Sequence, residues 1–163
     1  MAVAKALGAS RVIAVDIVPS RLEFAKSYAA TDIYLPPKPL EGETKLKYSA
    51  RNAKTLMEQL DIEERGHKAI DLVVDASGAE VSIQTGIIVA RQGGTYVQVG
   101  MGAPEIQIPV TTLLVKELNF KGSFRYGVRL SMLLLTNSNV LMICVKLAWR
   151  LRARHRIGCT GKD

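Results

Sequence analysis

Asp16 is the residue whose type and position say most about chemistry in this sequence. It closes the apolar run Arg11–Val15, and a helix-forming segment that opens at Pro19 follows it. In dinucleotide-binding folds an acid at this point accepts hydrogen bonds from both hydroxyls of the adenosine ribose and repels a 2′-phosphate. Asp16 therefore predicts NAD rather than NADP, with Arg21 beside the same ribose. The alternatives stay open: a solvated acid that caps the next helix, and an exposed arginine on that helix.

Small residues follow two further apolar runs. Ser77 and Gly78 come after the run 70–75, and Gly100–Gly102 come after the run 95–99. Small residues at the end of a strand let a ligand approach the backbone, so the second site is a candidate place for a nicotinamide ring. Ordinary turns between a strand and a helix use the same residues.

The residue types for other kinds of catalysis do not form recognisable sets. The two histidines and two cysteines lack zinc-ligand spacing: His67, His155, Cys144 and Cys159. There is no G-x-G-x-x-G motif, and no Ser-His-Asp set or carboxylate pair can be argued. We therefore predict no catalytic residue and no metal ligand in this chain.

The elements that must position these residues alternate between strands and helices. Strands are expected at 11–16, 33–35, 70–75, 95–99 and 118–124, with helices at 1–7, 19–28, 48–60, 80–90 and 111–116, and a turn at 93–94. Apolar strands that alternate with helices predict βαβ units in a doubly wound parallel α/β sheet.

Composition supports one globular domain with an unusual tail. The chain has 163 residues, of which 48% are hydrophobic, and a net charge of +7. Residues 1–127 hold 15 of the basic and 14 of the acidic residues, so the charge belongs to the tail, 128–163. The tail lacks a nucleic-acid motif, and its apolar stretch carries polar residues and Lys146, which are costly in a bilayer. We expect a cytoplasmic protein with no nucleic-acid or membrane partner.

Four segments of the body resemble zinc-dependent medium-chain alcohol and polyol dehydrogenases. They are Ala4–Asp16, Asp71–Glu80, Gly93–Gly102 and Lys121–Tyr126. The last is similar to the lysine-glycine-x-phenylalanine-arginine-tyrosine motif of sorbitol and xylitol dehydrogenases. The insert around Leu35–Pro39 looks most like that of fungal xylitol dehydrogenases. The resemblance covers residues 1–127.

This resemblance implies roles for single residues. The implied cofactor-binding residues are Asp16, Arg21, Val99, Gly100, Met101, Ser123, Phe124 and Arg125, and the implied polyol-binding residues are Arg125 and Tyr126. The family uses zinc to lower the pKa of a secondary alcohol, which then transfers a hydride to NAD.

The sequence also departs from the family. The family's glycine loop and first strand, and its zinc-binding catalytic domain, precede the segment that matches Met1, and residues 128–163 resemble no part of it. We therefore expect a Rossmann-type sheet that lacks its first strand, with a gap between the strands 11–16 and 70–75. Such a sheet is expected to aggregate or form homo-oligomers, to bind NAD weakly and to be inactive alone. The alternative is a non-catalytic pseudoenzyme or interaction module.

Overall fold

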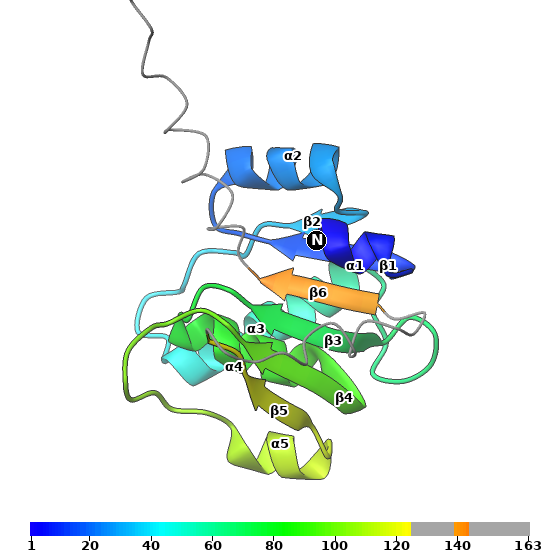
Figure 1. Cartoon of the computed structure of the whole chain (residues 1–163). Helices are drawn as coiled ribbons and strands as arrows, with labels where there is room; N and C mark the ends of the chain where they lie inside the picture. Colours follow the sequence, from blue (N-terminus) through cyan, green and yellow to red (C-terminus); the bar gives the residue numbers. More distant parts are fainter. Residues whose placement is uncertain (125–138, 144–163) are drawn as a thin grey trace, which may run out of the picture.

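The computed structural model of the chain describes residues 1–124 and 139–143. Its strands form one six-stranded sheet, in the order β2-β1-β6-β3-β4-β5, and every neighbouring pair is parallel (Figure 1). The strands are β1 (Arg11–Val15), β2 (Asp32–Tyr34), β3 (Ile70–Asp75), β4 (Ala90–Gln98), β5 (Asn119–Gly122) and β6 (Asn139–Ile143). The helices are α1 (Ala2–Ala6), α2 (Pro19–Tyr28), α3 (Lys45–Gln59), α4 (Glu80–Val89) and α5 (Val110–Val115). The expected doubly wound parallel α/β sheet is confirmed.

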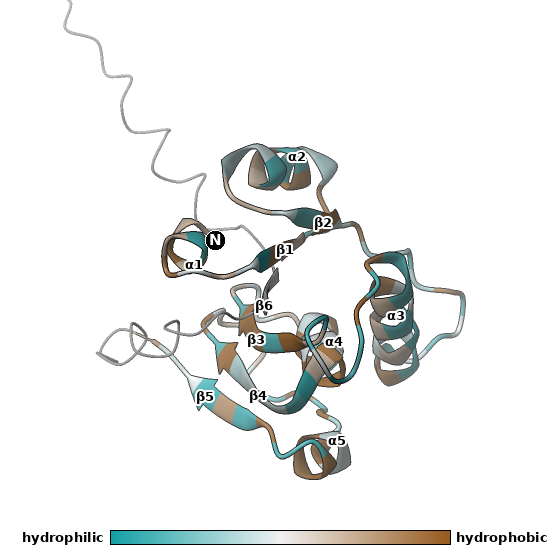
Figure 2. Cartoon of the chain, turned by 90° about the vertical axis from the view of Figure 1, so that its right-hand side faces the viewer, coloured by the Kyte–Doolittle hydropathy of each residue, from teal (hydrophilic) through white to brown (hydrophobic). Residues whose placement is uncertain are grey.

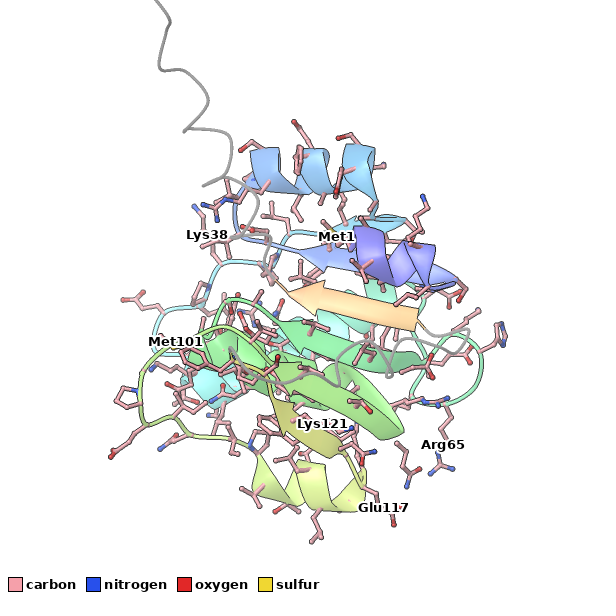
Figure 3. All side chains as sticks on the ribbon, viewed as in Figure 1. Met1, Lys38, Arg65, Met101, Glu117 and Lys121 are labelled. Atoms are coloured by element: carbon pink, nitrogen blue, oxygen red, sulfur yellow. The ribbon has the colours of Figure 1, made fainter. Side chains whose placement is uncertain are left out.

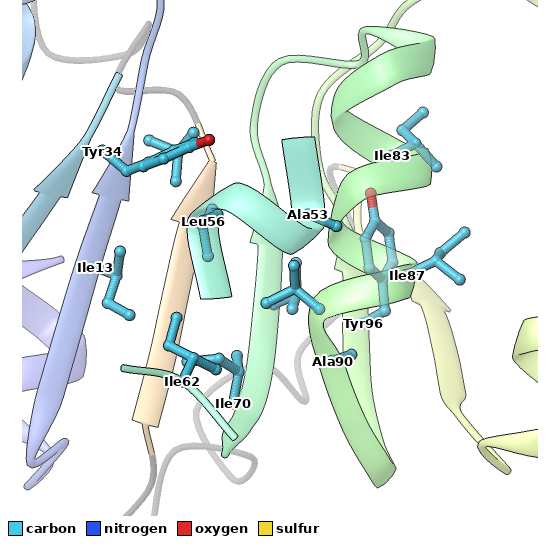
Figure 4. Close-up of a cluster of buried hydrophobic side chains, with 13 residues drawn as sticks. Ile13, Tyr34, Ala53, Leu56, Ile62, Ile70, Ile83, Ile87, Ala90 and Tyr96 are labelled. Atoms are coloured by element: carbon cyan, nitrogen blue, oxygen red, sulfur yellow. The ribbon is translucent and has the colours of Figure 1, made fainter. Parts of the chain in front are cut away.

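Helices cover both faces of this sheet (Figure 2). On one face, α3 and α4 pack Leu56 and Ile87 against Ile13, Ile70 and Tyr96, all fully buried (Figure 4). Each aliphatic side chain buried in this way contributes roughly 2 kcal/mol to stability. On the opposite face, α1 and α2 cover the smaller clusters around Val12 and Ala14. Because β1 is enclosed on both faces, its continuous apolar sequence is explained.

The expected gap between β1 and β3 is closed, which corrects that prediction. Strand β6, from the tail, lies between them and pairs with both. Two adjacent buried strand edges would leave rows of unpaired N–H and C=O groups, which are costly away from water. A tail segment that pairs with both edges removes this cost.

The expected turn at 93–94 is also wrong. Gly93 and Gly94 lie inside β4, which begins at Ala90, directly after α4. The register between β3 and β4 shifts between Ile70 and Leu72, and Gly93 has a φ of 68°. A glycine with positive φ at such an irregularity lets the strand continue through it, so glycines here mark a bulge and not a chain reversal.

Within residues 1–124 and 139–143, no helix combines the length and apolar character needed to cross a bilayer.

Candidate functional site

The carboxyl ends of the strands meet along one edge of the sheet, because all the strands run in the same direction. Backbone hydrogen bonds join the loops at this edge. The amides of Val99 and Gly100 donate to the carbonyl of Asp75, at 2.8 and 2.9 Å, and the amide of Ser123 donates to Gln98, at 2.8 Å. The structure thus brings together three of the segments that sequence analysis selected: 77–78, 99–101 and 123–124.

Asp16 lies on the same edge, on the far side of β6 from this group. Its Oδ1 accepts a hydrogen bond from the amide of Val18, the N-cap residue of α2, at 2.9 Å. Its side chain is fully buried, and Nη1 of Arg21 lies 3.7 Å from Oδ1. Asp16 therefore fixes the turn that precedes α2. It is buried and not solvated, so this part of the capping alternative is wrong, and Asp16 and Arg21 form an ion pair with each other.

The placement of Asp16 fits a role at the ribose. A carboxylate at the end of β1, next to the point where the chain changes direction across the sheet, is where open α/β sheets bind ligands. Arg21 retains 38% of its side-chain exposure, so it is free to rotate into solvent on its long side chain. A diol bound to Asp16 would compete with this ion pair.

Asp75 is a second strand-end acid, which sequence analysis did not select as a site residue. It is fully buried, and its Oδ1 accepts hydrogen bonds from Ser77 N, Ser77 Oγ and Gly78 N at 2.7, 3.0 and 2.8 Å. Its Oδ2 has no hydrogen-bond partner among the described residues. The available signal was the serine two residues after the acid, which is typical of an Asx turn.

Burial and the nearby Asp75 carboxylate act together on Tyr96. Tyr96 is fully buried in β4, and its hydroxyl donates to Oε1 of Gln98 at 2.9 Å. Burial is the larger effect and raises the pKa of Tyr96, and the negative charge of Asp75 raises this pKa further. Tyr96 therefore remains a neutral hydroxyl beneath the loops of the candidate site.

The glycines of the two central loops are required by the packing of these loops. Gly78 has a φ of 71°, which disfavours any side chain. A methyl group added to Gly100 would lie 2.6 Å from the carbonyl carbon of Ser77, and one added to Gly102 would overlap the backbone of Gly78. The loops after β3 and β4 therefore contact each other backbone to backbone.

Two apolar side chains are exposed at this edge of the sheet. Met101 is 77% and Phe124 is 65% exposed, and Figure 3 shows Met101 at the end toward which the strand arrows point. Ser123, which directly precedes Phe124 in the sequence, is half-buried. Arg125 and Tyr126 lie outside the described residues.

The described residues do not fit a zinc ion. They contain no group of three or more histidine, cysteine, aspartate or glutamate side chains with metal-binding geometry. A zinc ion in a dehydrogenase site needs three protein ligands together. Three of the four histidine and cysteine residues belong to the tail outside the described residues: Cys144, His155 and Cys159.

Comparison with known proteins identifies the family. Residues 1–136 match the family model described as "Zinc-binding dehydrogenase". The chain belongs to the zinc-binding dehydrogenase family. The membership expected from the four segments is thereby confirmed.

Fungal relatives narrow the similarity within this family. A "Probable D-xylulose reductase A" from Arthroderma otae is 50% identical over 129 residues, and a "D-xylulose reductase A" from Aspergillus niger is 52% identical over 126 residues. Both matches cover 77% of this chain and 32% of the relative. The chain thus spans about a third of the length of the curated relatives that it matches.

Solved structures show the same fold. L-Idonate 5-dehydrogenase from Escherichia coli superposes with a TM-score of 0.57 at 27% identity, over 82% of this chain and 34% of that one. An alcohol dehydrogenase from Escherichia coli complexed with NADH has a TM-score of 0.57 at 17% identity, over 81% and 35%. The second likeness concerns the fold alone.

Proposed function

We propose that this chain is the dinucleotide-binding part of an NAD-dependent polyol dehydrogenase of the xylitol and sorbitol type. The observation that carries the proposal is the 50–52% identity to relatives named D-xylulose reductase, in a chain whose strand ends converge on one edge. The reaction of such an enzyme is hydride transfer between a secondary alcohol and NAD.

The cofactor would extend along the carboxyl edge of the sheet. Asp16 would accept hydrogen bonds from the ribose hydroxyls after Arg21 has moved away, and Arg21 would then lie beside the ribose. The backbone of Val99, Gly100 and Met101 would pass the nicotinamide end.

Residues after β5 complete the proposed site. Ser123, Phe124 and Arg125 would line the nicotinamide, and Arg125 and Tyr126 would approach the polyol. Phe124 offers the exposed aromatic surface that a flat ring can contact.

Binding and turnover are separate parts of this proposal. The described residues do not supply three zinc ligands, so no step of the reaction is assigned to them. When bound in the family, zinc polarises the alcohol oxygen. We propose that the 163-residue chain binds NAD weakly and does not oxidise xylitol or sorbitol. Steady formation of NADH from xylitol by the purified chain would contradict the second statement.

Cofactor preference tests the assignment of Asp16. Calorimetric titration of the chain with NAD and with NADP is expected to show tighter binding of NAD, because a carboxylate repels the 2′-phosphate. Asp16→Ala is expected to reduce this preference by roughly tenfold, which corresponds to about 1.4 kcal/mol.

A charge-matched control separates this effect from a general change in charge. Glu23→Ala removes an acid from the exposed surface of α2 and should leave the preference unchanged. Equal affinity of the unmodified chain for NAD and NADP would overturn the role of Asp16.

A further inference from the structure

One segment of the chain, residues 75–84, holds both ends of the loop that joins β4 to α5 (Figure 1). At the start of this loop, the amides of Val99 and Gly100 donate to the carbonyl of Asp75, at 2.8 and 2.9 Å. Near its end, two side chains from the start of α4 bind the backbone of Gln107. Residues 101–105 lie exposed between these two points. The course of the exposed stretch therefore depends on two fixed ends.

The side chains that bind Gln107 are those of Glu80 and Gln84, four residues apart on one face of α4. Nε2 of Gln84 donates to the carbonyl of Gln107 at 2.7 Å, and the amide of Gln107 donates to Oε1 of Glu80 at 3.4 Å. Both polar groups of one residue's backbone are thus bound, as they would be by a neighbouring strand. We call Glu80 and Gln84 the loop clamp.

The amide of Gln84 is fixed by contacts outside the loop. Its side chain is fully buried, its Oε1 accepts a hydrogen bond from Oγ of Ser49 in α3 at 2.8 Å, and its Nε2 also donates to Oε1 of Glu80 at 3.3 Å. A backbone carbonyl can only accept, so the nitrogen of this amide must face Gln107 and the oxygen must face Ser49. A donor held in this way loses little conformational entropy when the loop binds it.

Apolar packing alone would not fix the register of the loop. Ile106 and Ile108 are partly buried and pack against the main core cluster. Attraction between apolar side chains is non-directional, so it tolerates a shift of the chain along its own axis. The hydrogen bonds of the loop clamp have preferred distances and directions, so they select one residue, Gln107. The clamp therefore sets how much chain spans the distance from Gly100 to α4.

We propose that Gln84 is a positioning residue for the proposed cofactor site. By holding Gln107, it sets the path of residues 100–105 along the carboxyl edge of the sheet, and so places Gly100 and Met101 beside the nicotinamide. This inference rests on the proposed function, which puts the backbone of these residues at that end of the cofactor. Gln84 acts through the loop and not by contact with the cofactor, so it affects the nicotinamide end and not the adenosine end at Asp16.

The first part of the test removes the amide of Gln84 and measures the loop without any cofactor. Gln84→Met in the full chain keeps a buried side chain of similar length and removes the hydrogen bonds to Gln107 and Ser49. A glutamate-specific protease then cleaves after Glu105, which is exposed in the loop. Cleavage there, relative to cleavage after the exposed Glu64 outside the loop, should become roughly five times faster, which corresponds to one lost hydrogen bond of about 1 kcal/mol.

The second part is a calorimetric titration of the same variant with two ligands. The Kd for NAD should rise by roughly fivefold, because the nicotinamide would meet a loop that is no longer held in one position. ADP-ribose has the same adenosine and pyrophosphate groups but no nicotinamide, so its Kd should change by less than about twofold. A general loss of structure would weaken both ligands alike, so the ratio of the two Kd values is the deciding measurement.

Asn52→Leu is the matched control. Asn52 is a second buried amide between α3 and α4, and its side chain is bonded to Tyr34 and Thr85, which lie outside the loop. This variant loses a buried amide from the same interface while the loop clamp remains. Its relative cleavage after Glu105, and its ratio of the Kd values for NAD and ADP-ribose, should stay within about twofold of the unmodified chain.

Glu80 gives a second test that does not depend on how Gln84→Met folds. The side chain of Glu80 is 15% exposed, and Glu80→Ala removes the acceptor for the amide of Gln107. Cleavage after Glu105 should rise by roughly threefold. Glu80→Gln keeps an oxygen that can accept from this amide, and it should restore slow cleavage.

Four results would overturn the proposal. Unchanged cleavage after Glu105 in both Gln84→Met and Glu80→Ala would show that the loop clamp does not hold the loop. Equal acceleration in Asn52→Leu would show a general loosening of the interface. Faster cleavage with an unchanged ratio of the two Kd values would separate the loop from the nicotinamide. If the unmodified chain bound neither ligand, the proposed function would fail together with the link from Gln84 to the cofactor, and cleavage would still decide whether the clamp holds the loop.

Discussion

The ends of β1 and β3 share one local hydrogen-bonding pattern, but the side chains around them differ. Asp16 and Asp75 each follow an apolar strand, and each uses Oδ1 to accept the amide two residues later, from Val18 at 2.9 Å and from Ser77 at 2.7 Å. Asp16 then pairs with Arg21, which is part-exposed. Asp75 instead accepts two more hydrogen bonds, from Ser77 Oγ and Gly78, beneath the loop that follows β4.

This difference separates an adaptable strand end from a fixed one. The charge of Asp16 is balanced by the part-exposed side chain of Arg21, which a ribose hydroxyl would replace under the proposed function. Asp75 is held by short bonds within its own turn, and the carbonyl of the same residue accepts the amides of Val99 and Gly100. The first end suits exchangeable binding, and the second suits the rigid support of neighbouring loops.

The largest effect is expected from Asp75→Ala. The change leaves the amides of Ser77 and Gly78 without their acceptor in a buried place, so we expect a loss of about 3 kcal/mol in the free energy of unfolding. Urea denaturation followed by circular dichroism measures it. Asp71→Ala on the same strand, which removes a part-exposed ion pair with Arg91, should cost below about 1 kcal/mol. Equal costs at the two positions would contradict a supporting role for Asp75.

The next largest effect is expected from Gly100→Ala, which should lower the free energy of unfolding by about 2 kcal/mol. The added methyl group would lie 2.6 Å from the carbonyl carbon of Ser77, so one of the two loops must shift. Gly122→Ala is the matched control, since nothing lies within 4 Å of an added methyl group there. Thermal unfolding compares the two variants. A Gly100→Ala protein as stable as the control would mean that these loops adapt easily.

The sequence predicted where β1 and β3 end better than it predicted the contacts of the acids that follow them. The apolar runs before Asp16 and Asp75 fixed both strands, because burial on two faces requires uninterrupted apolar residues. The same pattern left the role of Asp16 undecided, since a helix-capping acid and a ribose-binding acid require the same residue at the same place, and it assigned no role to Asp75. The contacts of these acids, such as Arg21 at 3.7 Å from Asp16, depend on three-dimensional placement.

The largest error of the sequence analysis concerned β6. Residues 139–143 were assigned to a tail without a place in the sheet, because residues 128–163 resemble no part of the family. Strand pairing over a crossover of this length leaves no local signal in the sequence. A short apolar run, Val140–Ile143, is compatible with strand or helix until the open edges of β1 and β3 are known.

Tyr34→Phe tests the hydrogen bond that joins β2 to α3. Without the bond to Asn52, the free energy of unfolding near neutral pH should fall by about 1 kcal/mol. Burial raises the pKa of Tyr34 from 10.0 to about 12. The folded state therefore holds this proton where the unfolded state releases it, and stability falls as pH rises above about 10, by roughly 1.4 kcal/mol per pH unit up to about 12. The phenylalanine variant should lose part of this alkaline dependence. Tyr28→Phe, at an exposed residue of α2, should retain all of it.

The substitution Asp16→Ala is expected to have an effect as small as that of Tyr34→Phe, and it completes the comparison with Asp75→Ala. The substitution removes one hydrogen bond to the amide of Val18 and an ion pair in which Arg21 is part-exposed, so the free energy of unfolding should fall by about 1 kcal/mol. The amide of Val18 loses its acceptor, and the freed guanidinium can reach water. The urea denaturation used for Asp75→Ala gives a direct difference of about 2 kcal/mol between the two aspartates. If Asp16→Ala were as damaging as Asp75→Ala, Asp16 would be a fixed structural acid, and its proposed exchange from Arg21 to a ribose would lose its physical basis.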